Sequence, residues 1–187
     1  MSRKLARVFD VDELVAECRG AIEESTPVLA VREVLQRALE HRDEIEQALP
    51  ATRAELTPLY MSDELTVLKL VWAPGMWLQP HDHRMWAAIA IYGGREDNTF
   101  YRREGGGAHV VATGGKELHA GDVALLGDDV VHSVKNPLSA FTGAIHVYGG
   151  NFFTRARSDW SMETFDLETD VVDRSRYFEE WNERLGL

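Results

Sequence analysis

The sequence predicts a mainly β fold, a small barrel or sandwich with helices before it and one helix after it. Three observations lead to this fold class. Short runs of apolar and β-branched residues recur at close, even spacing between about residues 59 and 150. Glycines separate these runs, as turns do in all-β sandwiches and barrels. The segments on either side show the apolar spacing of helices instead.

The chain length sets the expected organisation. A chain of 187 residues with 44% hydrophobic residues is long enough to bury one core, so we expect a single domain over 1–187. We divide it into a helical N-terminal extension over 1–58, a β-barrel core over 59–155 and a C-terminal segment with a helix over 156–187.

Helix signals stand at both ends of the chain. Asp10 can cap a first helix, and Thr26-Pro27 opens a second, which we expect to run to Pro50. Near the C-terminus, an apolar stripe predicts a helix that packs on the barrel wall. This stripe consists of Tyr177, Phe178, Trp181 and Leu185.

The strand candidates follow one another through the middle of the chain. A β-branched run at 65–72 is followed by a turn at Ala73-Pro74-Gly75. Helical segments do not alternate with the strands, so the pattern does not indicate βαβ units. The other candidates lie at 86–92, 99–103, 109–112, 123–126, 132–135 and 143–148.

Charge and cysteine content limit the function classes. The formal net charge is −11, and such an acidic chain repels nucleic-acid phosphates and anionic membrane surfaces. The single cysteine, Cys18, excludes an internal disulfide and favours the reducing cytoplasm; its helical surroundings predict a buried, inert thiol. No apolar leader follows the N-terminal residues, and no run is long enough to span a membrane. We therefore expect a soluble cytoplasmic protein.

Two histidines after a proline are the first sign of chemistry. His81 and His83 are two residues apart, so in a strand their side chains point to one face and can clamp a metal ion. The alternative is a pair of polar residues near a turn. The spacing alone does not decide between the two.

A second motif lies downstream. Gly121 starts a strand, a glycine turn follows, and His132 opens the next strand with Asn136 four positions after it. Together with the histidine pair, this pattern resembles the two sequence motifs of the cupin superfamily. The resemblance covers about residues 59–150 and implies a double-stranded β-helix, or jelly-roll barrel, in agreement with the strand pattern.

One feature departs from the usual cupin pattern. The first motif usually supplies a glutamate four or five residues after the histidine pair, where this chain has Ala87 and Ala88. Glu96 lies beyond a glycine turn, and we expect it on a solvated face. Imidazole suits iron, nickel, zinc and copper alike. The resemblance then implies a metal held by three imidazoles, those of His81, His83 and His132.

Among cupins, a three-histidine set without glutamate resembles the cysteine dioxygenase family of thiol dioxygenases. The family carries a late His-x-Tyr strand, which His146 and Tyr148 match here. The resemblance implies ferrous iron as the cofactor and an oxidoreductase activity that adds O2 to a small thiol to give a sulfinate. It also implies catalytic roles for these two residues: Tyr148 hydrogen-bonds substrate or oxygen and is oriented by His146.

The substrate-binding part of the resemblance is incomplete. Cysteine-specific members grip the substrate carboxylate with a tyrosine and an arginine two residues later; Tyr60 matches, but Ser62 replaces the arginine. Either another arginine reaches in, with Arg102 and Arg103 as candidates on opposite strand faces, or the substrate is not cysteine. The rest of the expected pocket lining consists of Trp77, Met85 and Trp86.

Two other functions stay open. The chain could be a metal-binding cupin that is not an oxygenase, such as a small-molecule sensor or a sugar-binding module, or a metal-free cupin with structural histidines. The combination of His132 with His146 and Tyr148 favours the enzyme, because a plain binding module does not need it. The expected partners are a small thiol and O2, with neither nucleic acid nor membrane, and a homodimer is left open.

Overall fold

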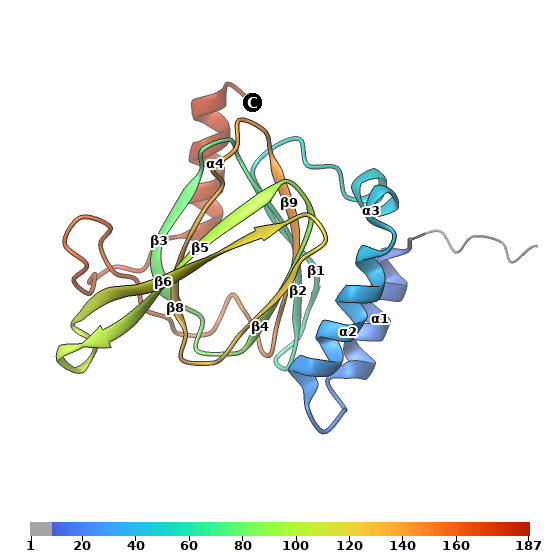
Figure 1. Ribbon diagram of the computed structural model, residues 1–187, viewed down its shortest axis with the longest axis horizontal. Coiled ribbons are helices and arrows are strands. Elements are labelled where there is room, and N and C mark those ends of the chain that lie inside the picture. Colours follow the sequence, from blue (N-terminus) through green and yellow to red (C-terminus); the bar gives the residue numbers. More distant parts are fainter. Residues whose placement is uncertain (1–8) are drawn as a thin grey trace, which may run out of the picture.

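Two antiparallel β-sheets form the body of the molecule, which is described by a computed structural model over residues 9–187 (Figure 1). The expectation about a leader sequence falls on residues outside this range. The larger sheet has the strand order β1-β2-β9-β4-β7, and the smaller has β3-β8-β5-β6. Apart from the β5–β6 hairpin, successive strands from β2 onward alternate between the two sheets. This is a jelly-roll, or double-stranded β-helix, and the predicted fold class is confirmed.

The predicted strands all occur, and two of them are longer than expected. β5 and β6 pair from Arg95 and His119 to Glu104 and His109. The added residues, 95–98 and 113–119, lie at the end of the hairpin away from its loop, and they are mostly charged, polar or glycine, so they carry little apolar signal. The bounds are β1 (Glu55–Met61), β2 (Thr66–Trp72), β3 (Trp77–Asp82), β4 (Ala87–Gly93), β5 (Arg95–Glu104), β6 (His109–His119), β7 (Val123–Leu126), β8 (Val131–Lys135) and β9 (Thr142–Tyr148).

Three helices precede the sheets: α1 (Val11–Ala21), α2 (Pro27–Leu39) and α3 (Arg42–Ala48). Asp10 caps α1 as predicted, accepting a hydrogen bond from the backbone N–H of Glu13 at 2.9 Å. The second predicted helix does not run unbroken to Pro50, because the chain turns at His41, which precedes α3. Apolar residues continue across this break since α3 faces the same buried layer as α2, and periodicity alone did not reveal the turn.

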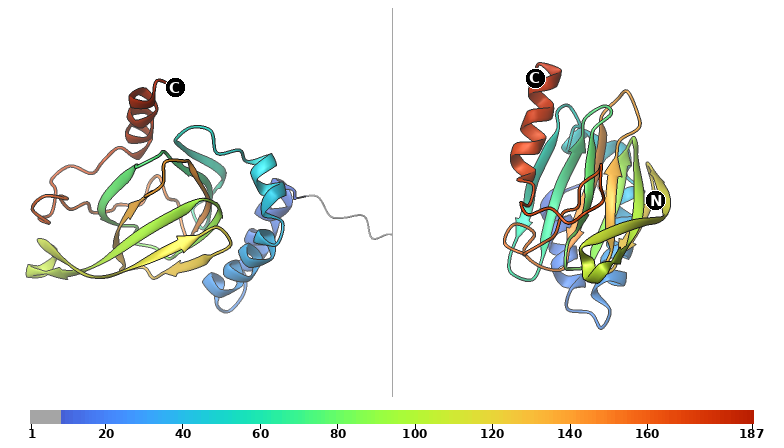
Figure 2. Two further views of the ribbon diagram at one scale, coloured as in Figure 1. Left: turned by 45° about the horizontal axis from the view of Figure 1, so that its top comes forward. Right: turned by 90° about the vertical axis from the view of Figure 1, so that its left-hand side faces the viewer.

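The central strands of the larger sheet, β2, β9 and β4, are buried on both faces. Along β2, Leu68 and Leu70 point into the core between the sheets, where they join Leu78 of β3, whereas Val67 points to the opposite side. There α1, α2 and α3 cover the outer face of the sheet (Figure 2). The helices also bury Cys18, and burial raises the pKa of its thiol to about 12. Double coverage explains why β2, β4 and β9 read as continuous apolar runs.

A fourth helix, α4 (Arg174–Leu185), lies beside the two edge strands β1 and β3 (Figures 1 and 2). Asn182 ties it to the segment before β1, accepting from the backbone N–H of Ala54 at 2.7 Å. Phe178 is buried in the core between the sheets, as the predicted stripe requires, but Leu185 is 42% exposed. The stripe was thus one turn too long, because α4 extends past the barrel wall. No helix of the described residues has the length and apolar character to cross a bilayer.

Candidate metal centre

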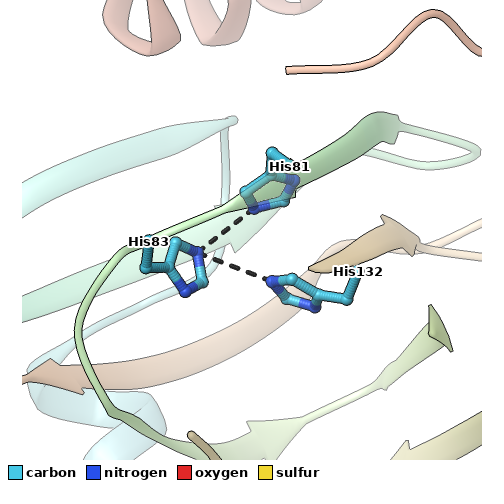
Figure 3. Close-up of side chains that lie close together, drawn as sticks. All are labelled: His81, His83 and His132. Atoms are coloured by element: carbon cyan, nitrogen blue, oxygen red, sulfur yellow. Dashed lines mark hydrogen bonds between the residues drawn. The ribbon is translucent and has the colours of Figure 1, made fainter. Parts of the chain in front are cut away.

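Three imidazoles converge inside the barrel (Figure 3). The Nε2 atom of His83 lies 3.2 Å from that of His81 and 3.5 Å from that of His132. The strand register accounts for this: His81 in β3 stands directly opposite His132 in β8. His83 follows β3 by one residue and still points to the same side. All three side chains are buried, with exposed fractions of 5% or less.

The tautomers of two of these imidazoles are set by their neighbours. Nδ1 of His81 faces the carbonyl of Gln79 at 2.8 Å, and Nδ1 of His132 faces Oδ1 of Asn98 at 2.6 Å. Both partners are acceptors, so each imidazole carries its proton on Nδ1 and directs the lone pair of Nε2 toward the common centre. Lone pairs aimed at one point repel one another unless a cation lies there. The donor set therefore fits a first-row divalent metal ion.

The electrostatics keep the three imidazoles in the form that binds metal. Burial lowers the pKa of His81 and His83 well below the usual value, and the neighbouring His132 lowers both further. Burial also lowers the pKa of His132 to about 4, against the opposing effect of Glu96. Neutral imidazole is the ligand form, so the site is ready for a metal at neutral pH.

No carboxylate of the described residues joins the three ligand atoms. Ala87 and Ala88 lie in β4 and are fully buried, one toward the core between the sheets and the other toward the N-terminal helices. Neither offers a ligand atom. The described structure therefore agrees with the sequence: no carboxylate takes the place of the glutamate of the usual cupin pattern.

Tyr148 and His146 lie beside the imidazoles, both on the inner face of β9. The ring of Tyr148 is 5.0 Å from that of His83, centroid to centroid, and its hydroxyl is 3.0 Å from Nδ1 of His146. Burial raises the pKa of Tyr148 above its usual value, so the hydroxyl keeps its proton at neutral pH. The sequence expectation that these two side chains face the barrel interior together agrees with their positions.

Glu96 is placed differently from the sequence expectation. It is 0% exposed rather than solvated, and its Oε2 lies 3.4 Å from Nε2 of His146. Asn98, two residues along β5, is also buried and holds the ring of His132. Sequence reasoning missed both because charged residues surround them. Their two-residue spacing on a strand with Phe100 was the signal that could have found them, since Phe100 packs against the inner core.

A small cavity lies next to the imidazoles, with about 20 Å³ open to the centre of a water molecule. Its wall is mostly apolar, and no acidic side chain belongs to it. This is room for about one water molecule, so a larger substrate requires side chains of the wall to move. The wall includes Leu56, Leu70, Trp72, Leu78, Phe152 and Phe178.

The four residues expected to line the pocket do not reach this cavity. Tyr60 faces the N-terminal helices, because a bulge in β1 shifts the register between Pro58 and Tyr60. Trp77 is 38% exposed at the start of β3. After His83 the chain turns through Arg84, whose φ is 55°, and leaves the cavity wall. After this turn, Met85 packs into the core between the two sheets. Trp86 packs against the apolar layer between the larger sheet and the N-terminal helices.

Arginine reaches the cavity from the C-terminal segment. Arg174, the first residue of α4, lines the cavity and is 6% exposed. One of its Nη atoms pairs with Asp159, while its Nε is buried without a hydrogen-bond partner among the described residues. Arg157 stacks over Phe152, 4.1 Å from the ring centroid, and its Nη1 is likewise buried and unpaired within the described chain. Burial and the charge of Arg174 lower the pKa of Arg157.

The arginines suggested by the sequence lie elsewhere. Arg102 is exposed and pairs with Glu104 on the hairpin. Arg103 points toward the buried Asp82, 2.7 Å away, and does not line the cavity. Ser62 closes a turn, donating to the carbonyl of Leu65 at 3.3 Å. Strand parity could not point to Arg174 or Arg157, because they come from the helix and the loop after the barrel.

Comparison with known proteins finds distant structural similarity only. No family-level sequence profile matches the chain. Among solved structures, a Bacillus halodurans protein is 18% identical, with a TM-score of 0.49 over 57% of this chain and 77% of that one. An RmlC-like cupin family protein with a double-stranded β-helix fold from Methanocaldococcus jannaschii is 14% identical, with a TM-score of 0.45 over 55% of this chain and 84% of that one. Oxalate decarboxylase from Bacillus subtilis is 16% identical, with a TM-score of 0.42 over 52% of this chain and 24% of that one.

Proposed function

We propose that the protein is a mononuclear non-haem iron enzyme of the thiol dioxygenase type. The observation that carries the proposal is the set of three convergent, neutral imidazoles without a carboxylate, with a protonated tyrosine hydroxyl next to them. In this proposal His81, His83 and His132 hold ferrous iron. Nickel, zinc and copper are the alternatives, because imidazole accepts all of them.

Bound ferrous iron would bring a thiolate and O2 together at the open coordination positions of the site. The reaction balances as R–SH + O2 → R–SO2⁻ + H⁺. Sulfur forms two bonds to oxygen and gives up four electrons, and O2 accepts them, so the reaction needs no further reductant.

Tyr148 and His146 would act on the substrate side of the metal. The buried hydroxyl of Tyr148 keeps its proton and can donate a hydrogen bond into the cavity. His146 holds that hydroxyl in place at 3.0 Å. The apolar wall excludes water, which strengthens these contacts.

The arginines support a substrate that carries an anion besides its sulfur. Arg174 brings positive charge and an Nε–H group without a hydrogen-bond partner among the described residues to the cavity wall, and Arg157 adds charge behind Phe152, another residue of that wall. A guanidinium binds a carboxylate through two parallel hydrogen bonds. Among the described residues, no acidic side chain lines the cavity to receive a substrate ammonium. This favours a small thiol carboxylate such as 3-mercaptopropionate over cysteine and cysteamine.

Oxygen consumption by the iron-loaded protein tests the proposal. The protein is loaded with ferrous iron without air and then mixed with O2 and 3-mercaptopropionate, cysteine or cysteamine. We expect one sulfinate per O2 consumed, fastest with 3-mercaptopropionate. Normal iron occupancy without O2 consumption for any thiol would defeat the activity and leave a metal-binding cupin of another class. Failure to retain any divalent metal would indicate a metal-free cupin.

A further inference from the structure

A buried carboxylate stands behind the candidate metal centre. Glu96 accepts hydrogen bonds from Nε1 of Trp72 at 2.8 Å and from Nδ2 of Asn98 at 3.0 Å. Through the Asn98 amide it reaches His132, whose Nδ1 lies 2.6 Å from the amide oxygen. We call this chain of contacts the asparagine arm.

The same carboxylate has a second connection. Its Oε2 lies 3.4 Å from Nε2 of His146, and the other ring nitrogen of His146 is 3.0 Å from the hydroxyl of Tyr148. We call this the histidine arm. One side chain thus contacts the residues that hold both a candidate ligand and the candidate catalytic tyrosine.

A charge in this position needs its partners. Burial alone would raise the pKa of Glu96, but the contacts with His146 and Asn98 lower it further than burial raises it, so the group is ionised. A buried ionised carboxylate costs several kcal/mol unless hydrogen bonds and an opposite charge compensate it. Here every compensating contact belongs to a residue of the cavity wall or of one of the two arms.

The asparagine arm has a direction. Asn98 must turn its NH2 group to the carboxylate, so its oxygen faces Nδ1 of His132 and can only accept a hydrogen bond. With the amide turned the other way, the NH2 group would face Nδ1, the ring proton would move to Nε2, and the metal-facing lone pair would be lost. The charge of Glu96 thereby fixes the tautomer of His132.

We propose that Glu96 is a positioning residue of the metal centre, which sets the tautomer of His132 through Asn98 and the orientation of Tyr148 through His146. The inference rests on the metal site of the proposed function and does not depend on which substrate is used. Partners of this kind, which orient the ligands of a metal, typically change metal affinity or activity by about 10- to 100-fold when removed.

The test is Co²⁺ binding to the full chain, followed by visible absorption, for the parent, Glu96→Gln and Asp97→Asn. The glutamine keeps the shape but presents an NH2 group to a site where the two hydrogen-bond partners, Trp72 and Asn98, are both donors. Asp97 is the matched control: it follows Glu96 on β5, faces the other side and pairs with Arg95 at 2.6 Å. We expect Glu96→Gln to bind Co²⁺ about tenfold more weakly or worse, with an altered spectrum, and Asp97→Asn to stay within about twofold.

A second variant, Asn98→Ala, removes only the asparagine arm. If Glu96→Gln does not fold, Asn98→Ala still tests whether this arm supports metal binding. It should weaken Co²⁺ binding as Glu96→Gln does, and the double variant should be no weaker than Asn98→Ala alone. Parental affinity and spectrum in both single variants would overturn the inference. Because the probe is Co²⁺ alone, a parent that binds it but oxidises no thiol would overturn the proposed activity and not this inference.

The histidine arm has its own readout in the thiol assay. Glu96→Gln should lower kcat more than Asn98→Ala does, because only the former disturbs Tyr148, while KM changes by about twofold or less. Equal kcat values for the two variants would remove the histidine arm from the inference.

Discussion

The two faces of β9, at the centre of the larger sheet, are buried equally but have different surroundings. Along β9, Ile145 and Val147 point outward and are 0% exposed, whereas His146 and Tyr148 point inward and are 2% exposed. The outer side chains meet the apolar faces of the N-terminal helices, and the inner ones meet polar partners around a cavity. Burial alone therefore does not mark a functional face; the presence of paired polar groups in the buried layer does.

The largest expected effect follows from removing a ligand on the inner side. His132→Ala should weaken metal binding by more than about 100-fold, since losing a ligand should exceed the loss of an orienting partner. Measurement of bound iron and Co²⁺ after desalting checks this. Unchanged metal stoichiometry in the variant would show that the ligand assignment is wrong.

Two arginines near the inner face of the sheet, Arg157 and Arg174, give the next test of the difference between the two faces. Arg157→Met keeps the apolar stem over Phe152 and removes the charge, and Arg174→Lys keeps the pairing with Asp159 but loses the planar fork. Each should raise KM for 3-mercaptopropionate by about 10- to 100-fold, the range for a lost hydrogen bond to a charged group. Arg102→Met, on the exposed hairpin, is the control. An unchanged KM in both Arg157→Met and Arg174→Lys would remove the carboxylate from the proposed substrate.

Tyr148→Phe removes one hydroxyl from the inner face and leaves the packing intact. We expect kcat to fall about tenfold, the size of one lost hydrogen bond of about 1.4 kcal/mol, while metal stoichiometry stays at the parental value. Steady-state oxygen consumption and iron analysis measure the two quantities. A parental kcat would show that the tyrosine is only a core residue.

The inner face could be predicted from the sequence where ligand spacing follows strand geometry. His81 and His83 share a face because strand side chains alternate, and the turn before His132 aligns it across the register. The sequence did not predict the burial of Glu96 and Asn98, because a charged residue in a charged segment is usually exposed. The only indication was that strand alternation places both on the same face as the apolar Phe100.

The cavity wall could not be predicted in the same way. Arg174 and Phe178 arrive from a helix that packs beside β1 and β3, and this docking is a tertiary contact without a local sequence signal. The bulge in β1 and the turn at Arg84 turned the predicted pocket residues away. Single-residue backbone irregularities of this kind reverse strand parity.

The buried imidazoles predict how the metal-free protein responds to acid. The pKa of His132 is about 4 in the folded chain and about 6.5 when unfolded, so the unfolded chain binds more protons between these values. Stability therefore falls as the pH drops from about 6.5 to about 4, by about 3 kcal/mol from this group alone. Urea unfolding of chelator-treated protein at several pH values measures this. The pH dependence should be shallower in His132→Gln, and an equal slope would show that another group carries it.

The smallest expected effect on the site comes from the outer face. Ile145→Ala leaves a cavity beneath the N-terminal helices and should cost about 2 to 5 kcal/mol of unfolding free energy. Co²⁺ affinity should stay at the parental value, because Ile145 contacts only the apolar layer.

Ile89→Ala is the matched inner variant: Ile89 is equally buried, lies in the core between the sheets and stands opposite His146 in the register. Its loss should cost similar stability and also lower kcat, since His146 would lose a packed neighbour. Equal kcat in the two variants would mean that the chemistry depends on the stability of the whole sheet and not on which face is disturbed.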